Sequence, residues 1–559
     1  SGGNTKGEII TSALSLNALA IEFPEILLHD ISSCLKFGCA CIETNDHTVQ
    51  EAGFDLLSSL FTRKNDAFFG IQHQFFTDVF QVFSINHSPL ISKALECIFH
   101  YIESTTLLRE FINNLFEVLL QALKVFNTPD IQYRVIDCFS SLVESLADEV
   151  APYAPNIIPV VFHAATQMNK PEECNLKASA IECIGMLIQY YNLLPDIPQI
   201  IQTLIACIQS GDEMLISAGF NALSKVVIAQ KPELLPALPI ALESALKIIS
   251  SEPEFIDDEE NDDKNDVLYD VWNFTMKFIS TVSKKIPDSI RPVANKFIQA
   301  LNKVIDDGIN EEIENLAIST SASLIKLCPP DDIINFLRFV LKILDDATTY
   351  GSASICFHII GKFIRKQQEY QLLIPEDIIQ VSCNYGLKAI TRNLVFQNDS
   401  NDSEVNIEFT TQLYYFFEDI ARSVPALFPL NDFWKFASKI FNKGNPFEQA
   451  EIISVLRVIY ESIYANITNI QKKLIIREFV QKLSICDCYN PPYPIAAVRT
   501  VVELEPNQLE KYIPQIMETI DKILETEYED QLAYNLTMDY VVSLLFSLFR
   551  VIFKENFFE

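Results

Sequence analysis

Residues 151–167 read APYAPNIIPVVFHAATQ, and after a polar break residues 175–191 read NLKASAIECIGMLIQYY. The same pattern returns as PDIPQIIQTLIACIQ at 195–209 and MLISAGFNALSKVVIAQ at 214–230, and it starts again at 232–249. Each copy has a proline-rich start, an apolar helical run, a short turn and a second helical run rich in small residues. The stretch therefore indicates one supersecondary unit that is repeated along the chain.

Prolines mark the spacing of these units. Pro155, Pro198 and Pro239 follow one another at intervals of 43 and 41 residues. A period near 40 residues with two helices per unit is typical of HEAT and armadillo repeats. Proline fits the first turn of a helix, where no amide proton is needed. The sequence therefore predicts an all-α, HEAT/armadillo-like α-solenoid superhelix.

The pattern extends over the whole chain as about twelve antiparallel helix pairs. A lone second helix at 5–21 comes first, and the prolines and apolar spacing place the two helices of each later pair. The predicted pairs are 24–42 with 46–63, 70–83 with 87–103, 106–126 with 130–148, 152–168 with 174–191, 196–209 with 213–229, 232–250 with 265–285, 289–306 with 310–327, 331–345 with 350–366, 375–391 with 404–423, 427–442 with 446–464, 467–483 with 491–505, and 506–525 with 529–553.

Two polar insertions interrupt the period. Residues 251–266 contain nine acids and one lysine, and such a run repels itself and is expected to be unfolded when free. A shorter polar insertion lies at 396–404. We predict a repeat array at 1–250, the acidic loop at 251–266, and a continuation of the same array at 267–559.

The charge of the chain limits its partners. Forty-two Lys and Arg stand against 74 Asp and Glu, which gives a net charge of −32. Nucleic acid and anionic membranes are therefore poor partners, whereas basic proteins are steered towards such a surface. The alternative is that the acidity serves mainly to keep a long helical rod soluble.

The sequence also indicates a compartment. The thirteen cysteines are scattered through helical runs, as small buried hydrophobic residues are in a reducing environment. No secretory signal or apolar run long enough to cross a membrane is found. We expect a cytosolic or nucleocytoplasmic monomer. Because the chain starts inside a repeat and without methionine, we also expect a fragment of a longer protein.

Catalytic and metal-binding patterns are not found. The seven histidines do not cluster, and the sequence has no HExxH motif, nucleophile elbow, phosphate-binding glycine loop or kinase signature. The two Cys-x-Cys pairs lack a second pair at zinc spacing. We predict no enzyme activity, catalytic residue, cofactor or metal, which leaves protein binding as the expected role.

Acidic and tryptophan residues are the candidates for protein binding. Acids recur on the second helices, where they form either an acidic wall for a basic partner or a solvated face. The two tryptophans are either buried in the core or exposed anchors for a partner. The candidate residues are Asp137, Glu144, Glu182, Glu314, the loop acids Asp257, Asp258, Glu259, Glu260, Asp262 and Asp263, and Trp272 and Trp434.

The repeat anatomy resembles the importin-beta (karyopherin-beta) family of nuclear transport receptors, and most of all its importin beta-3 branch. The stretch 131–161 is similar to that branch's unit in which a helix ends and a Y-x-P-x-(I/V)-(I/L)-P segment follows. The stretch 506–524 looks like the same segment without its second proline, and 404–441 looks like a helix after an acidic loop followed by a helix approaching a tryptophan. The similarity is diffuse and spans residues from about 100 to 553.

This resemblance implies a function and partners. Receptors of this family carry basic cargo through nuclear pores, bind nucleoporin phenylalanine–glycine repeats and respond to Ran-GTP, and they reside in cytoplasm and nucleus. Family members are about twice as long, and the N-terminal repeats that form a main Ran site have no counterpart here, which puts Ran binding in doubt. The alternative is a HEAT scaffold of another kind, such as a phosphatase regulatory subunit or assembly platform.

Overall fold

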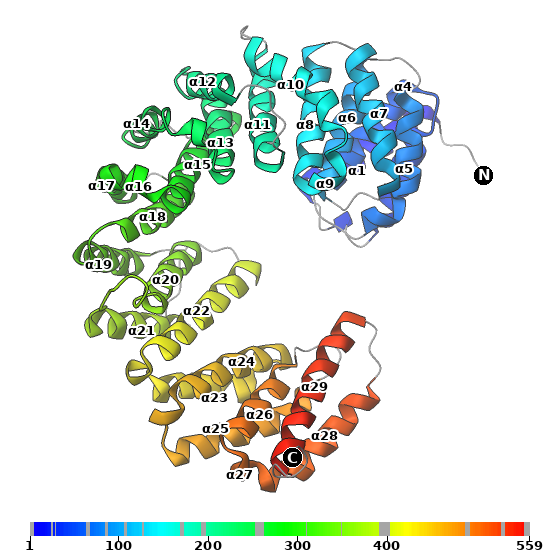
Figure 1. Ribbon diagram of the computed structural model, residues 1–559. Coiled ribbons are helices and arrows are strands. Elements are labelled where there is room, and N and C mark those ends of the chain that lie inside the picture. Colours follow the sequence, from blue (N-terminus) through cyan, green and yellow to red (C-terminus); the bar gives the residue numbers. More distant parts are fainter. Residues whose placement is uncertain are drawn as a thin grey trace, which may run out of the picture. The chain divides into compact units, whose positions relative to one another are not determined.

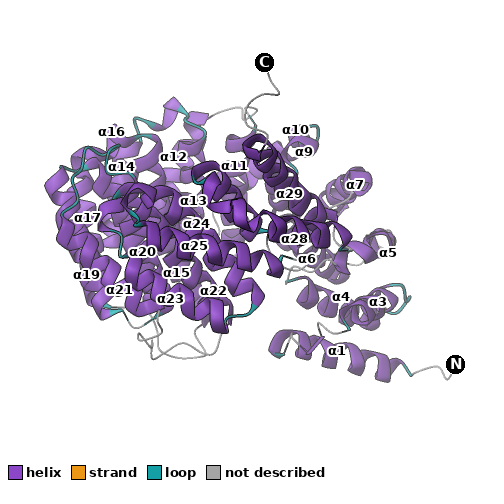
Figure 2. Cartoon of the chain, turned by 90° about the horizontal axis from the view of Figure 1, so that it is seen from below, coloured by secondary structure: helices purple, strands orange, loops and turns teal. Residues whose placement is uncertain are grey.

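The structure of the chain is a computed structural model. Over the described residues it consists of helices, turns and loops without a β-strand (Figure 2). It describes residues 5–23, 26–27, 30–62, 67–83, 88–104, 109–125, 128–167, 173–191, 197–251, 262–308, 310–347, 349–390, 403–486, 492–526 and 531–552. The all-α prediction is confirmed.

The chain forms two compact units, residues 1–309 and 310–559. In both units pairs of helices follow one another along the sequence (Figure 1). The α-helices of the first unit are α1 (Lys6–Glu22), α3 (Ile31–Ile42), α4 (His47–Phe61), α5 (Ala67–Phe83), α6 (Ser88–Ser104), α7 (Arg109–Val125), α8 (Pro129–Ser145), α9 (Ala147–Val150), α10 (Ala154–Gln167), α11 (Cys174–Tyr190), α12 (Ile197–Ile208), α13 (Glu213–Ile228), α14 (Leu238–Ile249), α15 (Asp262–Lys285), α16 (Pro287–Ile290) and α17 (Ala294–Asp307).

The second unit repeats this construction. Its α-helices are α18 (Glu311–Leu324), α19 (Pro330–Asp346), α20 (Tyr350–Arg365), α21 (Glu376–Ile390), α22 (Ser403–Ser423), α23 (Leu430–Lys443), α24 (Pro446–Ile463), α25 (Asn469–Gln481), α26 (Tyr493–Leu504), α27 (Pro506–Leu509), α28 (Ile513–Glu525) and α29 (Gln531–Ile552).

The second helices of successive pairs pack side by side, and we call this arrangement the second-helix row. In the first unit the row runs α1, α4, α6, α8, α11, α13 and α15, and in the second it runs α18, α20, α22, α24, α26 and α29. The first helices pack on the row from one side, as α19 and α21 do beside α20 and α22 (Figure 1). Because α1 packs on α4, its prediction as a lone second helix is confirmed.

The prolines lie where the period places them. Pro155, Pro198 and Pro239 are each the second residue of a helix, in α10, α12 and α14. There the missing amide proton costs no hydrogen bond, because the first turn of a helix has no acceptor for it. The predicted helices 196–209 and 213–229 agree with α12 and α13 to within one residue at each end.

Three predicted helices are shorter than expected, for a reason that also involves proline. The predictions 232–250, 289–306 and 506–525 each begin with a short turn, and the long helix follows from Leu238, Ala294 or Ile513. A proline within the first turns cannot donate its hydrogen bond and clashes with the preceding turn, so one continuous helix is not formed. Within the predicted helix 24–42, the structure has α3 from Ile31 to Ile42, and residues 26–27 are also helical.

The core lies between the two layers of helices. Aromatic residues at helical spacing, such as Phe76, Phe416 and Phe417, are buried there, as the sequence predicts. The described cysteines are free thiols, and most of them are buried. None of the described helices is long and apolar enough to span a membrane.

Small residues set the distance between second helices. A Cβ atom added at Gly185 in α11 would lie 2.7 Å from the Cα atom of Ala222 in α13. We therefore expect Gly185→Ala to push the two helices apart and to lower the free energy of unfolding by about 1–3 kcal/mol. Gly70→Ala in α5 is the matched control, because no atom lies within 4 Å of the added carbon.

Urea unfolding followed by circular dichroism tests this expectation. The control substitution is expected to be neutral or to stabilise the protein, since alanine favours a helix over glycine by about 0.5–1 kcal/mol. Equal stabilities of the two variants would show that α11 and α13 can separate without cost.

Candidate protein-binding surfaces

Polar side chains connect neighbouring second helices of the first unit. Arg134 in α8 pairs with Glu96 in α6, an acid of the neighbouring repeat, at 3.2 Å. The hydroxyl of Ser141 in α8 donates to the Glu103 carboxylate in α6 at 3.3 Å. Each contact joins residues 38 positions apart, about one repeat. The row is therefore held together by hydrogen bonds and ion pairs as well as by its apolar core.

Asp137 lies in the middle of α8 and takes part in this network. Its carboxylate accepts a hydrogen bond from the Ser179 hydroxyl of α11, and Tyr133 donates to it from the preceding turn. Burial raises the pKa of Asp137, and the bonds from Ser179 and Tyr133 offset part of that rise. Asp137 is therefore a half-buried carboxylate with little solvation by water.

Glu182 occupies the corresponding place one helix further along. The amide of Asn221 in α13 donates to its carboxylate at 3.2 Å. Burial raises the pKa of Glu182, and the nearby charges of Asp137 and Asp270 raise it further. Burial lowers the pKa of Lys225, whereas Glu144 and Glu182 raise it. We call Asp137, Glu144, Glu182, Lys225 and Asp270 the acidic cluster.

The raised pKa of Asp137 makes stability depend on pH. A folded pKa above the unfolded value, about 3.9, means that folding favours the protonated acid. The stabilisation that comes from protonation of Asp137 is fully present below the unfolded pKa. It is lost as pH rises through the folded pKa. We expect Asp137→Asn, which retains an acceptor for Ser179, to gain stability over the wild type as pH rises from about 4 to 7.

Urea unfolding at a series of pH values measures this difference. The control is Asp288→Asn in α16, where the side chain is 92% exposed. That variant removes the same charge at a position where the carboxylate is not buried. A difference at Asp137 that does not change with pH would contradict the effect of burial.

In the second unit, the candidate Glu314 lies in the first turn of α18. It is half-buried, and burial, followed by the charge of Glu311, raises its pKa. Glu311 itself accepts hydrogen bonds from Thr349 and, at 3.4 Å, from Ser352 of α20. Glu314 therefore lies beside a contact between two neighbouring second helices.

The two candidate tryptophans differ in how deeply they are buried. Trp272 in α15 is 1% exposed, so it is not a partner anchor, and the interpretation as buried packing is correct. Trp434 is half-buried in α23, a first helix, with its ring 6.2 Å from that of Phe441. Neither tryptophan belongs to the acidic cluster.

The acidic insertion lies partly outside the described residues. Its candidate residues Asp257, Asp258, Glu259 and Glu260 lie outside the described residues. Asp262 and Asp263 are not in a loop but form the start of α15, which begins before the predicted 265. Acids in the first turn of a helix are favoured by the helix dipole, which explains the earlier start.

Several residues in and around the cluster were not predicted from the sequence. Tyr133, Ser179, Asn221, Lys225 and Asp270 hold or neighbour the predicted acids. The separation of 42 residues between Asp137 and Ser179, and of 39 between Glu182 and Asn221, equals one repeat. A search for polar partners one period away could therefore have found two of them.

Comparison with known proteins gives matches among solved structures. No family model matches the chain, and no curated protein matches it by sequence. The structure of Kap121p bound to Pho4p matches with a TM-score of 0.69 and 12% identity, over 99% of this chain and 56% of that chain. Kap121p bound to the SUMO protease Ulp1p gives a TM-score of 0.70 at 12% identity, over 98% and 55%.

A further match is Kap121p bound to Nup53p, with a TM-score of 0.68 and 12% identity, over 100% of this chain and 56% of that chain. The present chain thus spans a little over half the length of these relatives. At this identity the likeness concerns the fold. The chain has the helical-repeat fold of the karyopherin Kap121p, over a length equal to about half of that protein.

Proposed function

We propose that this chain is part of a nuclear transport receptor that binds basic cargo on the second-helix row of its first unit. The observation that carries the proposal is the acidic cluster. Glu144 and Glu182 come from neighbouring helices and share one lysine, Lys225, and Asp137 lies near Glu182. Their summed charge attracts a cationic segment, and the repeat places them in register along the row.

The raised pKa values of Asp137 and Glu182 support this role. A poorly solvated carboxylate gains more from a nearby cation than a carboxylate fully exposed to water does. One exposed ion pair contributes about 0.2–1 kcal/mol, so tight binding needs several such contacts along an extended segment. Recognition then depends on a basic peptide that crosses more than one repeat.

The other parts of the proposal rest on the likeness in fold. Kap121p has been solved with Pho4p, with the SUMO protease Ulp1p and with Nup53p. By analogy, this chain binds nucleoporin phenylalanine–glycine segments, responds to Ran-GTP as part of a longer receptor, and passes between cytoplasm and nucleus. In this role the protein acts by binding and release, without catalysis.

A non-transport HEAT scaffold is the competing function. Both functions use a helical-repeat surface, so the fold does not distinguish them. Binding to phenylalanine–glycine peptides and release of a basic partner by Ran-GTP belong to the transport receptor alone.

Fluorescence anisotropy with two peptides tests the proposal. We expect an extended lysine-rich peptide to bind with an affinity that falls as salt is raised, and its glutamate analogue not to bind at this surface. A phenylalanine–glycine repeat peptide, measured in parallel with its serine–glycine counterpart, tests the transport role. If the chain bound neither the lysine-rich peptide nor the phenylalanine–glycine peptide, the scaffold function would be favoured.

A further inference from the structure

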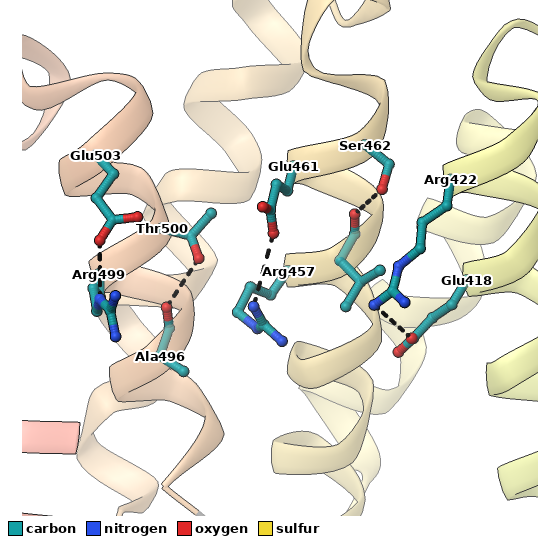
Figure 3. Close-up of polar contacts among 10 residues, drawn as sticks. Glu418, Arg422, Arg457, Glu461, Ser462, Ala496, Arg499, Thr500 and Glu503 are labelled. Carbon is teal, nitrogen blue, oxygen red and sulfur yellow. Dashed lines mark hydrogen bonds and ion pairs between the residues drawn. The ribbon is translucent and has the colours of Figure 1, made fainter. Parts of the chain in front are cut away.

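Three successive second helices of the second unit each carry one arginine. Arg422 lies in α22, Arg457 in α24 and Arg499 in α26, and each is the sole basic residue of its helix. Figure 3 shows their guanidinium groups on the same side of the three neighbouring helices. We call these residues the arginine row.

Each arginine of the row pairs with a glutamate of its own helix. Arg422 pairs with Glu418 at 3.4 Å, Arg457 with Glu461 at 3.9 Å and Arg499 with Glu503 at 2.9 Å (Figure 3). The arginine side chains are 53%, 30% and 43% exposed. Because the pairs are four residues apart and partly solvated, a competing carboxylate can replace the glutamate at small cost.

Other arginines of the second-helix rows have a different arrangement. Arg134 pairs with an acid of the neighbouring helix, Glu96, and Arg365 in α20 pairs with Asp419 in α22 at 3.4 Å. Those contacts connect helices. The ion pairs of the arginine row each lie within one helix, and the charge of Arg457 in α24 also offsets part of the effect of burial, which raises the pKa of Glu418 in α22.

The spacing of the row fits a particular ligand. Packed helices lie about 8–10 Å apart, and a polyproline II segment advances about 9 Å in one turn of three residues. Acidic side chains at every third position of such a segment therefore meet successive arginines. Guanidinium groups bind carboxylates through paired hydrogen bonds. We propose that α22, α24 and α26 bind an extended acidic segment with Asp or Glu at every third residue.

This surface goes beyond basic-cargo binding and uses a different unit of the chain. A long nucleic acid is disfavoured because the protein's net charge is −32. A short acidic peptide is affected less, since at physiological salt charges farther than about 8 Å are largely screened. Binding of the peptide then depends on the local arginines and on displacement of the glutamates that pair with them.

Two acidic peptides of equal composition test the proposal by fluorescence anisotropy at physiological salt. One repeats Glu-Pro-Ser, and the other has its glutamates in one block. We expect the repeated peptide to bind more tightly, and we expect Arg422→Gln, Arg457→Gln and Arg499→Gln together to weaken it about tenfold, equal to 1.4 kcal/mol. The thermal unfolding temperature of this variant is expected to stay close to that of the wild type.

The matched control changes the net charge equally at other exposed arginines. It combines Arg291→Gln, Arg338→Gln and Arg477→Gln, which lie outside the row, and is expected to bind the repeated peptide like the wild type. Equal affinity of both triple variants, or equal binding of both peptides, would overturn the proposal. So would tighter, arginine-dependent binding of a single-stranded oligonucleotide of the same charge.

Discussion

Replacing Trp272 by alanine is expected to lower the free energy of unfolding by about 3–5 kcal/mol, the range for large aromatic residues in a core. Trp272 is 1% exposed in α15, where that helix packs on α13 and α14. Alanine removes the buried ring and leaves a cavity that rigid helices on both sides cannot fill completely. Urea unfolding followed by circular dichroism measures the loss.

Trp434→Ala provides the comparison for this substitution. Trp434 is half-buried in α23, so less apolar surface returns to water and the expected loss is smaller. Equal losses at the two positions would mean that Trp272 is not the better packed of the two. A small effect at Trp272 alone would show that α13, α14 and α15 close around the cavity.

The second large effect concerns the acidic cluster. Asp137→Asn, Glu144→Gln and Glu182→Gln together are expected to weaken binding of an extended lysine-rich peptide by at least about tenfold, equal to 1.4 kcal/mol. The neutral amides retain acceptors for Ser179 and Asn221, so the fold is expected to persist. Anisotropy titrations at low and high salt measure the loss, and the salt dependence should become weaker.

A control variant with the same change in charge distinguishes this surface from general attraction. Glu233→Gln, Glu243→Gln and Asp288→Asn remove three exposed acids of the same unit outside the second-helix row. We expect this variant to bind the peptide nearly as the wild type does. Similar losses in both triple variants would mean that net charge, and not the cluster, attracts the peptide.

The fold was largely accessible from the sequence because its determinants are local. Pro155 and Pro198 place helix starts, and the small residue Gly185 marks a close helix contact. The missed features were the short turns before α14, α17 and α28, where a proline near the helix start has to be weighed against a continuous apolar pattern.

The candidate site was accessible only in part. Asp137 and Glu182 were predicted from their acidity, but their burial and their partners depend on how successive repeats are superimposed. Trp272 could not be assigned by pattern alone, because a buried tryptophan and an exposed anchor have the same apolar neighbours in sequence. Arg457 and Arg499 form a row only once their helices are placed side by side.

The hydrogen bonds between repeats have a consequence for how the chain folds. Ser141 to Glu103, Asn221 to Glu182 and Tyr464 to the Leu504 carbonyl connect residues separated by 38, 39 and 40 positions. Closing a loop costs entropy that rises with its length, and here that length is the same for each added repeat. Folding can therefore start at any well-packed pair and spread to its neighbours, with a rate set by one repeat and not by the 559 residues of the chain.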